Sequence, residues 1–319
     1  MAAPPIILTI AGFDPSSGAG VTADLKVIAA HESYGVAAIT ALTVQSTLGV
    51  RQVHPIDPAI LAATLDELAA DFAIDAVHIG MLANHAIVTA VADFLEKTRL
   101  PHIVLDPILR SSSGAELLDP AGTRALIERL LPLAEVVTPN LDEAAALAGL
   151  TRASGAAAGS PANSSTTSST TFDGTKLETI TFESMSSALD AMRAFARQLH
   201  TLGATNVVVT AGHLEKAIDL LSLTTSRGIE QEVFKATRQS SNSTHGTGCA
   251  FATAIACHLA HGRGLPEAVL LAKAYVSAAI ANAQPIGHGA GPLHHLYRMQ
   301  QQRRPSAVIS DPEHLFSRK

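Results

Sequence analysis

The feature that most constrains the fold is an alternation of short apolar runs, rich in β-branched residues, with longer segments of helical period. The runs IILTI, VAAITALTVQ, AVHIGML and HIVLDP are each followed by such a segment, and VVTPN and NVVVTAG continue the series. This alternation predicts a mainly parallel sheet with helices on both faces, joined by right-handed crossovers. We therefore expect an α/β protein with three αβα layers.

The rhythm changes after Gly212. The runs AIDLLSLTT and IEQEVFKAT are separated only by residues 226–228, which indicates a hairpin and predicts antiparallel strands at one edge of the sheet. Helices are expected over 248–261 and 266–284, and Gly262 stands in the usual position just after a helix end.

One domain is expected over residues 1–300. The Ser, Thr, Ala and Gly-rich segment at about 151–178 has too few large apolar residues to order itself, so we interpret it as a disordered surface insertion. A domain boundary there is the alternative, but the later run Val207–Gly212 reads as one more strand of the same sheet. Residues 301–319 are expected to be a loose C-terminal tail.

Composition and charge exclude several classes of protein. The chain has 319 residues, 47% hydrophobic, which argues against a wholly disordered protein. Its net charge is −6 and its basic residues are scattered, so nucleic acid is not an expected partner. The apolar run Ile6–Ile10 is cut short by Gly12, which fits neither a signal peptide nor a membrane span.

The two cysteines, Cys249 and Cys257, stand eight residues apart on one expected helix. At ~1.5 Å per residue they would lie about 12 Å apart, which is too far for a disulfide. Reduced thiols and a cytoplasmic location are therefore expected.

Unusual polar residues follow several expected strands, where open α/β sheets place their sites. Gly12, Gly18 and Gly20 follow the first strand and allow close backbone approach beside a helix start, either for a ligand or for a tight turn. The glycines do not form the G-x-G-x-x-G pattern, and the chain has no G-x-x-x-x-G-K-[ST]. A dinucleotide site and a P-loop are therefore disfavoured.

Three further strand ends carry side chains suited to ligands. Gln45 could offer a donor and an acceptor to a planar heterocycle, or could be a surface residue. Asp106, with Asn140 and Glu143 after the next strand, could hold Mg²⁺ through water. Asn140 and Glu143 also have the spacing of a helix capping box, and the two roles can coexist.

The stretch STHGTGCAFATAIACHLAHG carries the strongest chemical signal. The amides of Gly246, Thr247 and Gly248 at a helix start would converge on an anion, as phosphoryl or acyl transfer requires. A cysteine there, Cys249, is expected to have a lowered pKa, with a small buried hydrophobic role as the alternative. The chain has no G-x-S-x-G, H-E-x-x-H or C-x-x-C, and the pair His294–His295 reads as surface structure rather than a metal site.

Seven motifs in order resemble the hydroxymethylpyrimidine kinase/phosphomethylpyrimidine kinase family of thiamin biosynthesis, in the ribokinase superfamily. They are TIAGFDPSSGAGVTADLK, YGVAAITALTVQST, IGML, VLDP, TPNLDEA, STHGTGC and GHGAGPLHH, and with the insertion excepted they span Ile6 to His295. The resemblance implies a ribokinase-like fold. It also implies transfer of the ATP γ-phosphoryl group to 4-amino-5-hydroxymethyl-2-methylpyrimidine and then to its monophosphate.

The resemblance also implies roles for particular residues. Gln45 would pair with the aminopyrimidine edge, while the pyrimidine pocket would be lined by Gly12, Asp24 and Met81. Asn140 and Glu143 would serve ATP and Mg²⁺, the latter through water, and Asp106 is a weaker candidate for the phosphate region. The anion hole would be formed by Gly246, Thr247 and Gly248, with Cys249 as the catalytic base.

The chain departs from the family at two points. Thr210 stands where the family has a Lys near the nucleotide, and Arg110 or Lys273 would have to compensate. Ser17–Gly18 replaces a Gly-Gly pair, which is a milder change. A pyridoxal or pyridoxine kinase, and a catalytically silent pyrimidine-binding regulator, therefore remain as alternatives.

The resemblance further implies a homodimer, and leaves the need for a monovalent cation open. The Ser- and Gly-rich loop 109–118 beside Asp106 is interpreted as a lid over the phosphates, with a simple flexible connection as the alternative.

Overall fold

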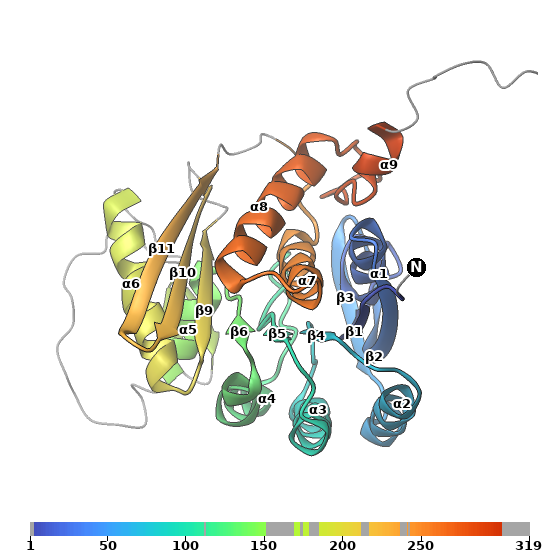
Figure 1. The fold of residues 1–319 in the computed structure, drawn as a ribbon, viewed down its shortest axis with the longest axis horizontal. Helices are drawn as coiled ribbons and strands as arrows, with labels where there is room; N and C mark the ends of the chain where they lie inside the picture. The colour runs from blue at the N-terminus through green and yellow to red at the C-terminus, as the bar shows by residue number, and fades with distance from the viewer. Residues whose placement is uncertain are drawn as a thin grey trace, which may run out of the picture.

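The computed structural model describes residues 3–111, 113–150, 169–172, 175–178, 185–211, 217–236, 241 and 243–301. A nine-stranded sheet with the order β11-β10-β9-β6-β5-β4-β1-β2-β3 forms its centre (Figure 1). The strands of this sheet are β1 (Ile6–Phe13), β2 (Tyr34–Ser46), β3 (Gly49–Pro55), β4 (Ala76–Ile79), β5 (Ile103–Leu105), β6 (Val136–Val137), β9 (Asn206–Ala211), β10 (Ala217–Thr225) and β11 (Gly228–Ala236).

The six strands from β9 to β2 pair in parallel, and antiparallel strands complete both edges. At one edge β10 pairs antiparallel with β9 and with β11, as the hairpin signal predicts. At the other edge β3 pairs antiparallel with β2. The sequence did not predict β3, because all of its residues are exposed or half-buried and none carries the apolar pattern of a covered strand.

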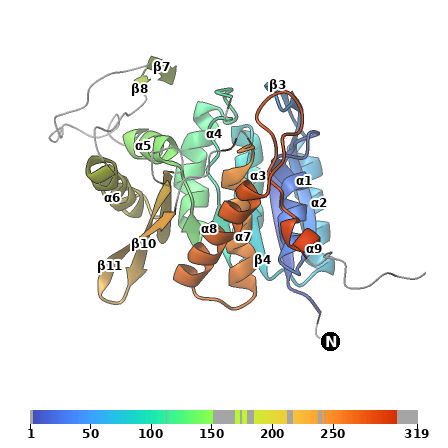
Figure 2. The same ribbon diagram turned by 90° about the horizontal axis from the view of Figure 1, so that it is seen from above.

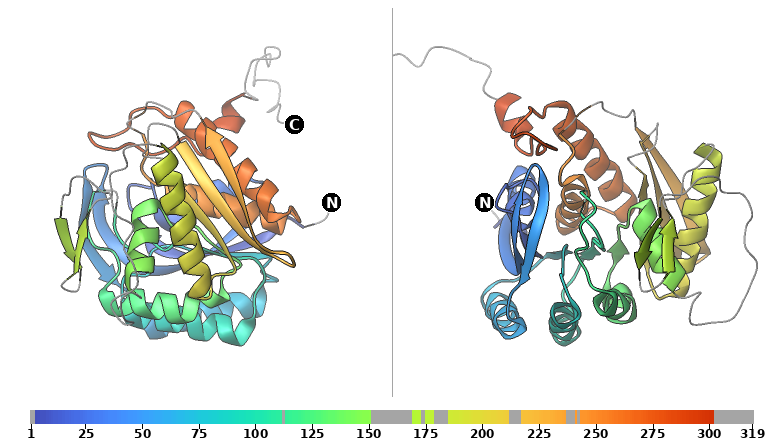
Figure 3. Two further views of the ribbon diagram at one scale, coloured as in Figure 1. Left: turned by 90° about the vertical axis from the view of Figure 1, so that its left-hand side faces the viewer. Right: turned by 180° about the vertical axis from the view of Figure 1, so that it is seen from behind.

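Helices cover both faces of the sheet, which confirms the three-layer prediction (Figures 1 and 3). One face packs against α1 (Gly20–Ala30), α7 (Thr247–Ala260) and α8 (Leu265–Ala281). The other face packs against α2 (Pro58–Asp71), α3 (His85–Thr98), α4 (Pro120–Ala125), α5 (Leu141–Leu150) and α6 (Met185–Thr201). A short π-helical turn (Leu126–Leu130) and a 3₁₀ turn (Leu131–Leu133) continue α4, and α9 (Tyr297–Gln301) ends the described chain.

The apolar core is divided between the two sheet faces. Leu8 and Ile10 of β1 face the layer of α2 to α6, while Ile7 faces the layer of α1, α7 and α8. This alternation along a strand buried on both sides follows from the period of two in extended backbone. Helices α7 and α8 lie side by side, as the view from above shows (Figure 2).

Most of the expected disordered insertion at about 151–178 lies outside the described residues. Within it, β7 (Ser169–Phe172) and β8 (Thr175–Glu178) pair as a separate two-stranded antiparallel ladder, so these eight residues have regular structure where none was expected. The prediction of one domain over 1–300 stays a prediction, and the expected tail at 301–319 lies outside the described residues except for Gln301. Within the part of the chain that is described, no helix has the length and apolarity to span a bilayer.

Candidate active site

The site is built around the start of α7, where the backbone of two distant loops meets. Gly246 precedes the helix with φ +81°, a left-handed conformation that glycine adopts without strain, and no side chain caps the helix. A Cβ on Gly246 would lie 2.0 Å from the carbonyl oxygen of Gly18, so the turn needs glycine to approach the loop between β1 and α1. The amides of Thr247 and Gly248 belong to the first turn of α7, where helix amides have no intrahelical partner and attract anions.

A hydrogen bond between Asp14 and His245 joins these two loops. Asp14, 2% exposed, accepts hydrogen bonds from the amides of Ser16, Gly18 and Ala19. Its Oδ2 atom also lies 2.9 Å from Nε2 of His245, in the turn before α7. Burial favours the neutral acid, but the hydrogen bonds from His245 and Ser16 outweigh it and lower the pKa of Asp14.

Both residues of this pair were overlooked in the sequence, although they lie inside motifs quoted above. Asp14 follows a strand and precedes Pro, Ser and Gly, which is the pattern of an Asx turn. His245 stands directly before the glycine turn. The position of Asp14 before a turn was a usable signal, whereas its pairing with His245 depends on tertiary structure.

Cys249 lies in the first turn of α7 and is 8% exposed. Its surroundings shift the pKa of its thiol in opposite directions. Burial raises the pKa of its thiol far above the ordinary value, and the carboxylates of Asp106 and Asp24 raise it further. The amide of Gly20, at the start of α1, donates a hydrogen bond to the sulfur and acts in the opposite direction. The expectation of a lowered pKa is therefore wrong for the protein without ligands, because burial and acidic neighbours outweigh the helix N-terminus.

Asp106 follows β5 and is hydrogen-bonded to the Cys249 thiol. Burial raises the pKa of its carboxyl, against the attraction of His78. Gly248 also approaches it, since a Cβ on Gly248 would lie 3.6 Å from Oδ2 of Asp106. The structure therefore places Asp106 next to the expected base and anion hole, closer to the chemistry than the sequence alone indicated.

Asn140 and Glu143 form the capping box that the spacing predicted. The amide of Asn140 donates to Oε2 of Glu143, and the amide of Glu143 donates to Oδ1 of Asn140, both at 2.9 Å. Oε1 of Glu143 also accepts from the amide of Leu109 at 3.4 Å. Burial and the charge of Asp106 raise the pKa of Glu143.

The loop 109–118 folds back on itself beside this pair. Arg110 bridges Glu116 in antiparallel register, and the amide of Leu117 donates to the carbonyl of Leu109. At its tip, Oγ of Ser113 accepts a hydrogen bond from the amide of Val50, in β3. Ser112 lies outside the described residues, and the lid role of this loop stays a prediction.

Three of the residues expected at the pyrimidine pocket lie near one another. A Cβ on Gly12 would lie 2.9 Å from the methyl carbon of Met81, so these two residues are in contact. Nε2 of Gln45 donates to Oγ1 of Thr43 at 2.6 Å, and Thr43 donates to the carbonyl of Phe13, the neighbour of Gly12. Gln45 is half-buried at the end of β2.

Asp24 occupies a different environment from the one expected. Its side chain is fully buried and accepts hydrogen bonds from the hydroxyls of Thr9 and Thr253, beside the ring of His78. A carboxylate enclosed in this way does not line an open pocket, so the expected lining role of Asp24 is corrected. The sequence held a signal, because Asp24 falls on the apolar face of α1 between Val21 and Ile28.

The region around Thr210 contains a buried ion pair. Thr210 bridges Asn140, and it lies opposite Asp219 of β10 in register. Asp219 pairs with Lys273 of α8 at 2.6 Å, and both side chains are buried. Lys273 therefore supplies a cation close to the position where the family has a Lys, although its charge is paired with Asp219. Gly212 and His213 lie outside the described residues.

Two further expectations concern residues outside the site. Cys257 is fully buried among apolar side chains, which confirms packing as its role, and both cysteines are free thiols. His295 is only 4% exposed, and burial lowers its pKa to about 4. The expectation of a surface role for the pair His294–His295 is wrong for this residue, which is buried and whose backbone carbonyl accepts a hydrogen bond from the hydroxyl of Tyr275 in α8.

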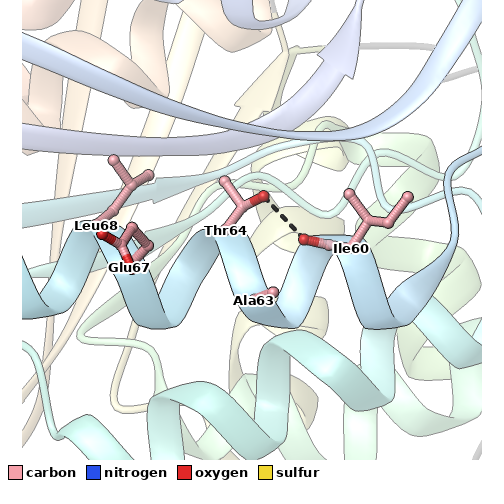
Figure 4. Close-up of a pocket in the computed structure, with 5 residues that line it drawn as sticks. All are labelled: Ile60, Ala63, Thr64, Glu67 and Leu68. Carbon is pink, nitrogen blue, oxygen red and sulfur yellow. Dashed lines mark hydrogen bonds between the residues drawn. The ribbon is translucent and has the colours of Figure 1, made fainter.

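Metal-binding groups are sparse in the described part of the chain, where no cluster of three or more His, Cys, Asp or Glu side chains could by itself hold a metal ion. A shallow pocket lies on α2, lined by Ile60, Ala63, Thr64, Glu67 and Leu68 (Figure 4). In this pocket the hydroxyl of Thr64 donates a hydrogen bond to the carbonyl of Ile60, at 2.8 Å. Since α2 covers the sheet face opposite α7, this pocket is not part of the candidate site.

Helix amides that attract an anion, next to carboxylates at the carboxyl ends of parallel strands, are suited to phosphoryl transfer. The fold and the site together define a ribokinase-like kinase of small molecules. The family model described as phosphomethylpyrimidine kinase matches residues 14–166 and 171–294, and the chain belongs to this family.

Comparison with known proteins agrees with this assignment. The hydroxymethylpyrimidine/phosphomethylpyrimidine kinase of Salmonella typhimurium is 39% identical over 292 residues, covering 91% of this chain and 97% of the relative. A bifunctional thiamine biosynthesis protein of Geobacter sulfurreducens is 39% identical over 299 residues, and the chain spans only 53% of its length. The pyridoxal kinase of Bacillus subtilis, solved with ADP, superposes with a TM-score of 0.74 at 31% identity, covering 93% of this chain and all of that one.

Proposed function

We propose that this protein phosphorylates 4-amino-5-hydroxymethyl-2-methylpyrimidine with ATP, and then phosphorylates the monophosphate to the diphosphate, as a step of thiamin diphosphate biosynthesis. Membership of the phosphomethylpyrimidine kinase family carries this proposal. The relative from Salmonella typhimurium, which the chain covers almost from end to end, bears both activities in its name. With two free thiols, the protein suits a reducing compartment such as the cytoplasm.

In this proposal the anion hole holds the transferred phosphoryl group. The amides of Gly246, Thr247 and Gly248 supply donors fixed before the reaction, so they need no reorganisation as negative charge shifts. The carbonyl of Gly18 contacts the turn at Gly246, and the hydrogen bond between Asp14 and His245 joins the turn to the loop between β1 and α1. Holding donor and acceptor in one geometry is the main requirement of phosphoryl transfer.

Cys249 is the proposed base for the hydroxymethyl proton. In the protein without ligands its raised pKa keeps it a thiol, hydrogen-bonded to Asp106. The same burial raises the pKa of Asp106 and makes that carboxylate a better proton acceptor. The proton can therefore pass from the substrate hydroxyl to Cys249 while the thiol proton passes to Asp106, so that no free thiolate is required.

The acidic groups of the site fit a divalent cation. Burial and the charge of Asp106 make the ionised form of Glu143 costly, and an added cation would relieve that cost. Mg²⁺ commonly binds through one or two carboxylates, water and substrate phosphates, which suits a site without a three-residue cluster. Glu143, with Asn140 beside it, would hold Mg²⁺ through water, and the ion would neutralise charge on the ATP phosphates.

The pocket proposed for the pyrimidine lies at Gly12, Met81 and Gln45. The Gly12–Met81 contact offers an apolar surface to a flat ring. Gln45 can present its amide to the aminopyrimidine edge once the bond to Thr43 is exchanged. Asp24 is left out of this pocket.

The direct test is incubation of the purified protein with ATP, Mg²⁺ and the hydroxymethylpyrimidine, followed by chromatography of the products. Mono- and diphosphate are expected in sequence. A folded protein that binds both substrates and gives neither product would refute the proposal. Calorimetry with ATP alone addresses the missing Lys, because a silent pyrimidine-binding regulator would show no ATP heat.

A pyridoxal kinase is the second candidate, favoured by the match to the Bacillus subtilis enzyme at a TM-score of 0.74. Both substrates are heterocycles that carry a hydroxymethyl group, so one pocket could accept either. The ratio of kcat/KM for the two substrates decides between them, since that ratio reports the pocket contacts. The homodimer implied by the family resemblance also remains a proposal, which light scattering after size-exclusion chromatography would test.

A further inference from the structure

A fully buried polar cluster lies beneath α7. It consists of Thr9 of β1, Asp24 of α1, His78 of β4 and Thr253 of α7, and all four side chains are fully buried. The Nδ1 atom of His78 lies 3.3 Å from Thr9 Oγ1, 3.2 Å from Thr253 Oγ1 and 3.3 Å from Asp24 Oδ2. A single ring nitrogen, Nδ1 of His78, therefore faces three oxygen atoms.

The hydrogen bonds of the cluster fix where one ring proton lies. Thr9 donates to Oδ2 of Asp24 at 2.7 Å, and Thr253 donates to Oδ1 at 3.1 Å. Each hydroxyl has a single hydrogen, so both can only accept from His78. All three neighbours of Nδ1 are therefore acceptors, and Nδ1 carries a proton.

The charge of Asp24 determines the state of the other ring nitrogen. A carboxylate at 0% exposure is costly unless a cation pairs with it, and among the described residues its one ion pair is with His78. Nε2 of His78 is buried without a hydrogen-bond partner, neither donor nor acceptor, so the charge of Asp24 decides the state of the ring. An imidazolium satisfies the charge of Asp24, whereas a neutral ring leaves it uncompensated.

The cluster adjoins the candidate site through α7 and β5. Thr253 follows Cys249 by four residues, so both lie on the same face of α7, one turn apart. Asp106 lies at the end of the strand next to β4, and its charge acts on His78. The His78 ring is thus a buried cation that acts on the carboxylates of Asp24 and Asp106, close to the thiol of Cys249.

We infer that His78 is a positioning residue of the kinase site, whose buried positive charge offsets Asp24 and Asp106 and so lets the anion hole beside Cys249 accept a phosphate anion. The inference rests on the proposed kinase function. Without that charge, two carboxylates would repel the incoming phosphates.

The groups that face His78 set the expected pH dependence. Burial lowers the pKa of His78, but the charge of Asp24, its hydrogen bond and the charge of Asp106 outweigh burial and raise the pKa. The groups around the ring are the carboxylates of Asp24 in α1 and of Asp106 just after β5, the hydroxyls of Thr9 in β1 and Thr253 in α7, and the thiol of Cys249 one turn away on α7. Because the folded-state pKa is raised, the stabilisation is complete below the ordinary histidine value and is lost as pH rises through the raised value.

Nuclear magnetic resonance tests the charge without any variant. The chemical shifts of the His78 ring carbons, assigned through the backbone, are followed in the wild-type protein from about pH 6 to about pH 9. The expected result is a charged ring at pH 7 that titrates above the ordinary histidine range. A neutral ring at pH 7 would overturn the inference, whether or not the protein proves to be a kinase.

Variants test the role of the charge in catalysis. His78→Gln removes the charge, and kcat is expected to fall about tenfold to hundredfold with little change in KM for the pyrimidine. His78→Lys keeps a cation that titrates far higher, so it should restore most of kcat and abolish the alkaline fall in stability. Adding Asp24→Asn to His78→Gln removes both charges and should recover part of the thermal stability lost in the single variant.

Each outcome has a defined meaning. A folded His78→Gln protein with wild-type kcat would overturn the positioning role. An equal loss of kcat in the Gln and Lys variants would also overturn it, because shape rather than charge would then matter. If the wild-type protein shows no kinase activity, the proposed function fails, while the resonance titration still decides the charge of His78.

Discussion

The glycine at the start of α7 permits a sharp prediction, because a second glycine ends the same helix in a similar conformation. Gly246 has φ +81° and Gly262 has φ +78°. A Cβ on Gly262 would meet nothing within 4 Å, whereas a Cβ on Gly246 would lie 2.0 Å from the carbonyl oxygen of Gly18. The two substitutions to alanine therefore share the conformational cost and differ in the contact.

Gly262→Ala should cost about 1 kcal/mol for the left-handed backbone, a shift of roughly 1–2 °C in Tm for a chain of this length, with unchanged kcat. Gly246→Ala carries the same cost, and the turn must also move by roughly 1 Å, which should lower kcat about a hundredfold. The added strain should bring its total cost to about 2–4 kcal/mol. Thermal melts and steady-state kinetics with ATP and the pyrimidine measure both effects. Equal losses of kcat in the two variants would refute the argument that contact with Gly18 shapes the anion hole.

Three further predictions follow from buried groups. Cys249→Ala should lower kcat by ~10² to 10⁴. The control variant Cys257→Ala, on the same helix, should change stability alone. An unchanged kcat in Cys249→Ala would mean that Cys249 has a packing role. Lys273→Ala should cost about 3–5 kcal/mol in chemical denaturation because it leaves Asp219 buried and unpaired, and a loss below about 1 kcal/mol would mean that water reaches Asp219. His295, whose pKa burial lowers to about 4, stabilises the fold above the ordinary histidine pKa and loses that contribution as pH falls from about 6.5 toward 4. His295→Phe should therefore flatten the decline of Tm over this range, and an unaltered decline would assign it to other groups.

The sequence predicted the sheet and its covering helices because both depend on local period. Runs such as IILTI are apolar on both faces, as strands buried in a parallel sheet are, and the longer helical segments between them indicate crossovers. The strand β3 was missed because its side chains lie at an exposed edge, where pairing with β2 rather than burial holds the strand. Backbone pairing of this kind leaves almost no trace in composition.

The candidate site was predictable only in part, for a related reason. Glycine turns and capping residues such as Asn140 can be recognised from the residues next to them in the sequence. The structure contains the capping box that the spacing of Asn140 and Glu143 predicted. The pKa of Cys249 depends on Asp24 and Asp106, which reach it from other elements. A helix start alone predicted the opposite direction, because the field at a buried thiol is a property of the assembled interior.

The contact of Gly18 with Gly246 and the hydrogen bond of Asp14 with His245 join distant positions, and the second pair lies 231 residues apart in the chain. A ribosome must therefore make most of the protein before the phosphate-binding turn can close. A nascent chain that stops before residue 243 would have the first loop and all nine strands of the sheet, but it would lack His245, the partner of Asp14 from the second loop. Catalytic competence should thus arise late in synthesis, after much of the sheet, and a fragment supplied in trans would need to contain the whole of α7 to restore it.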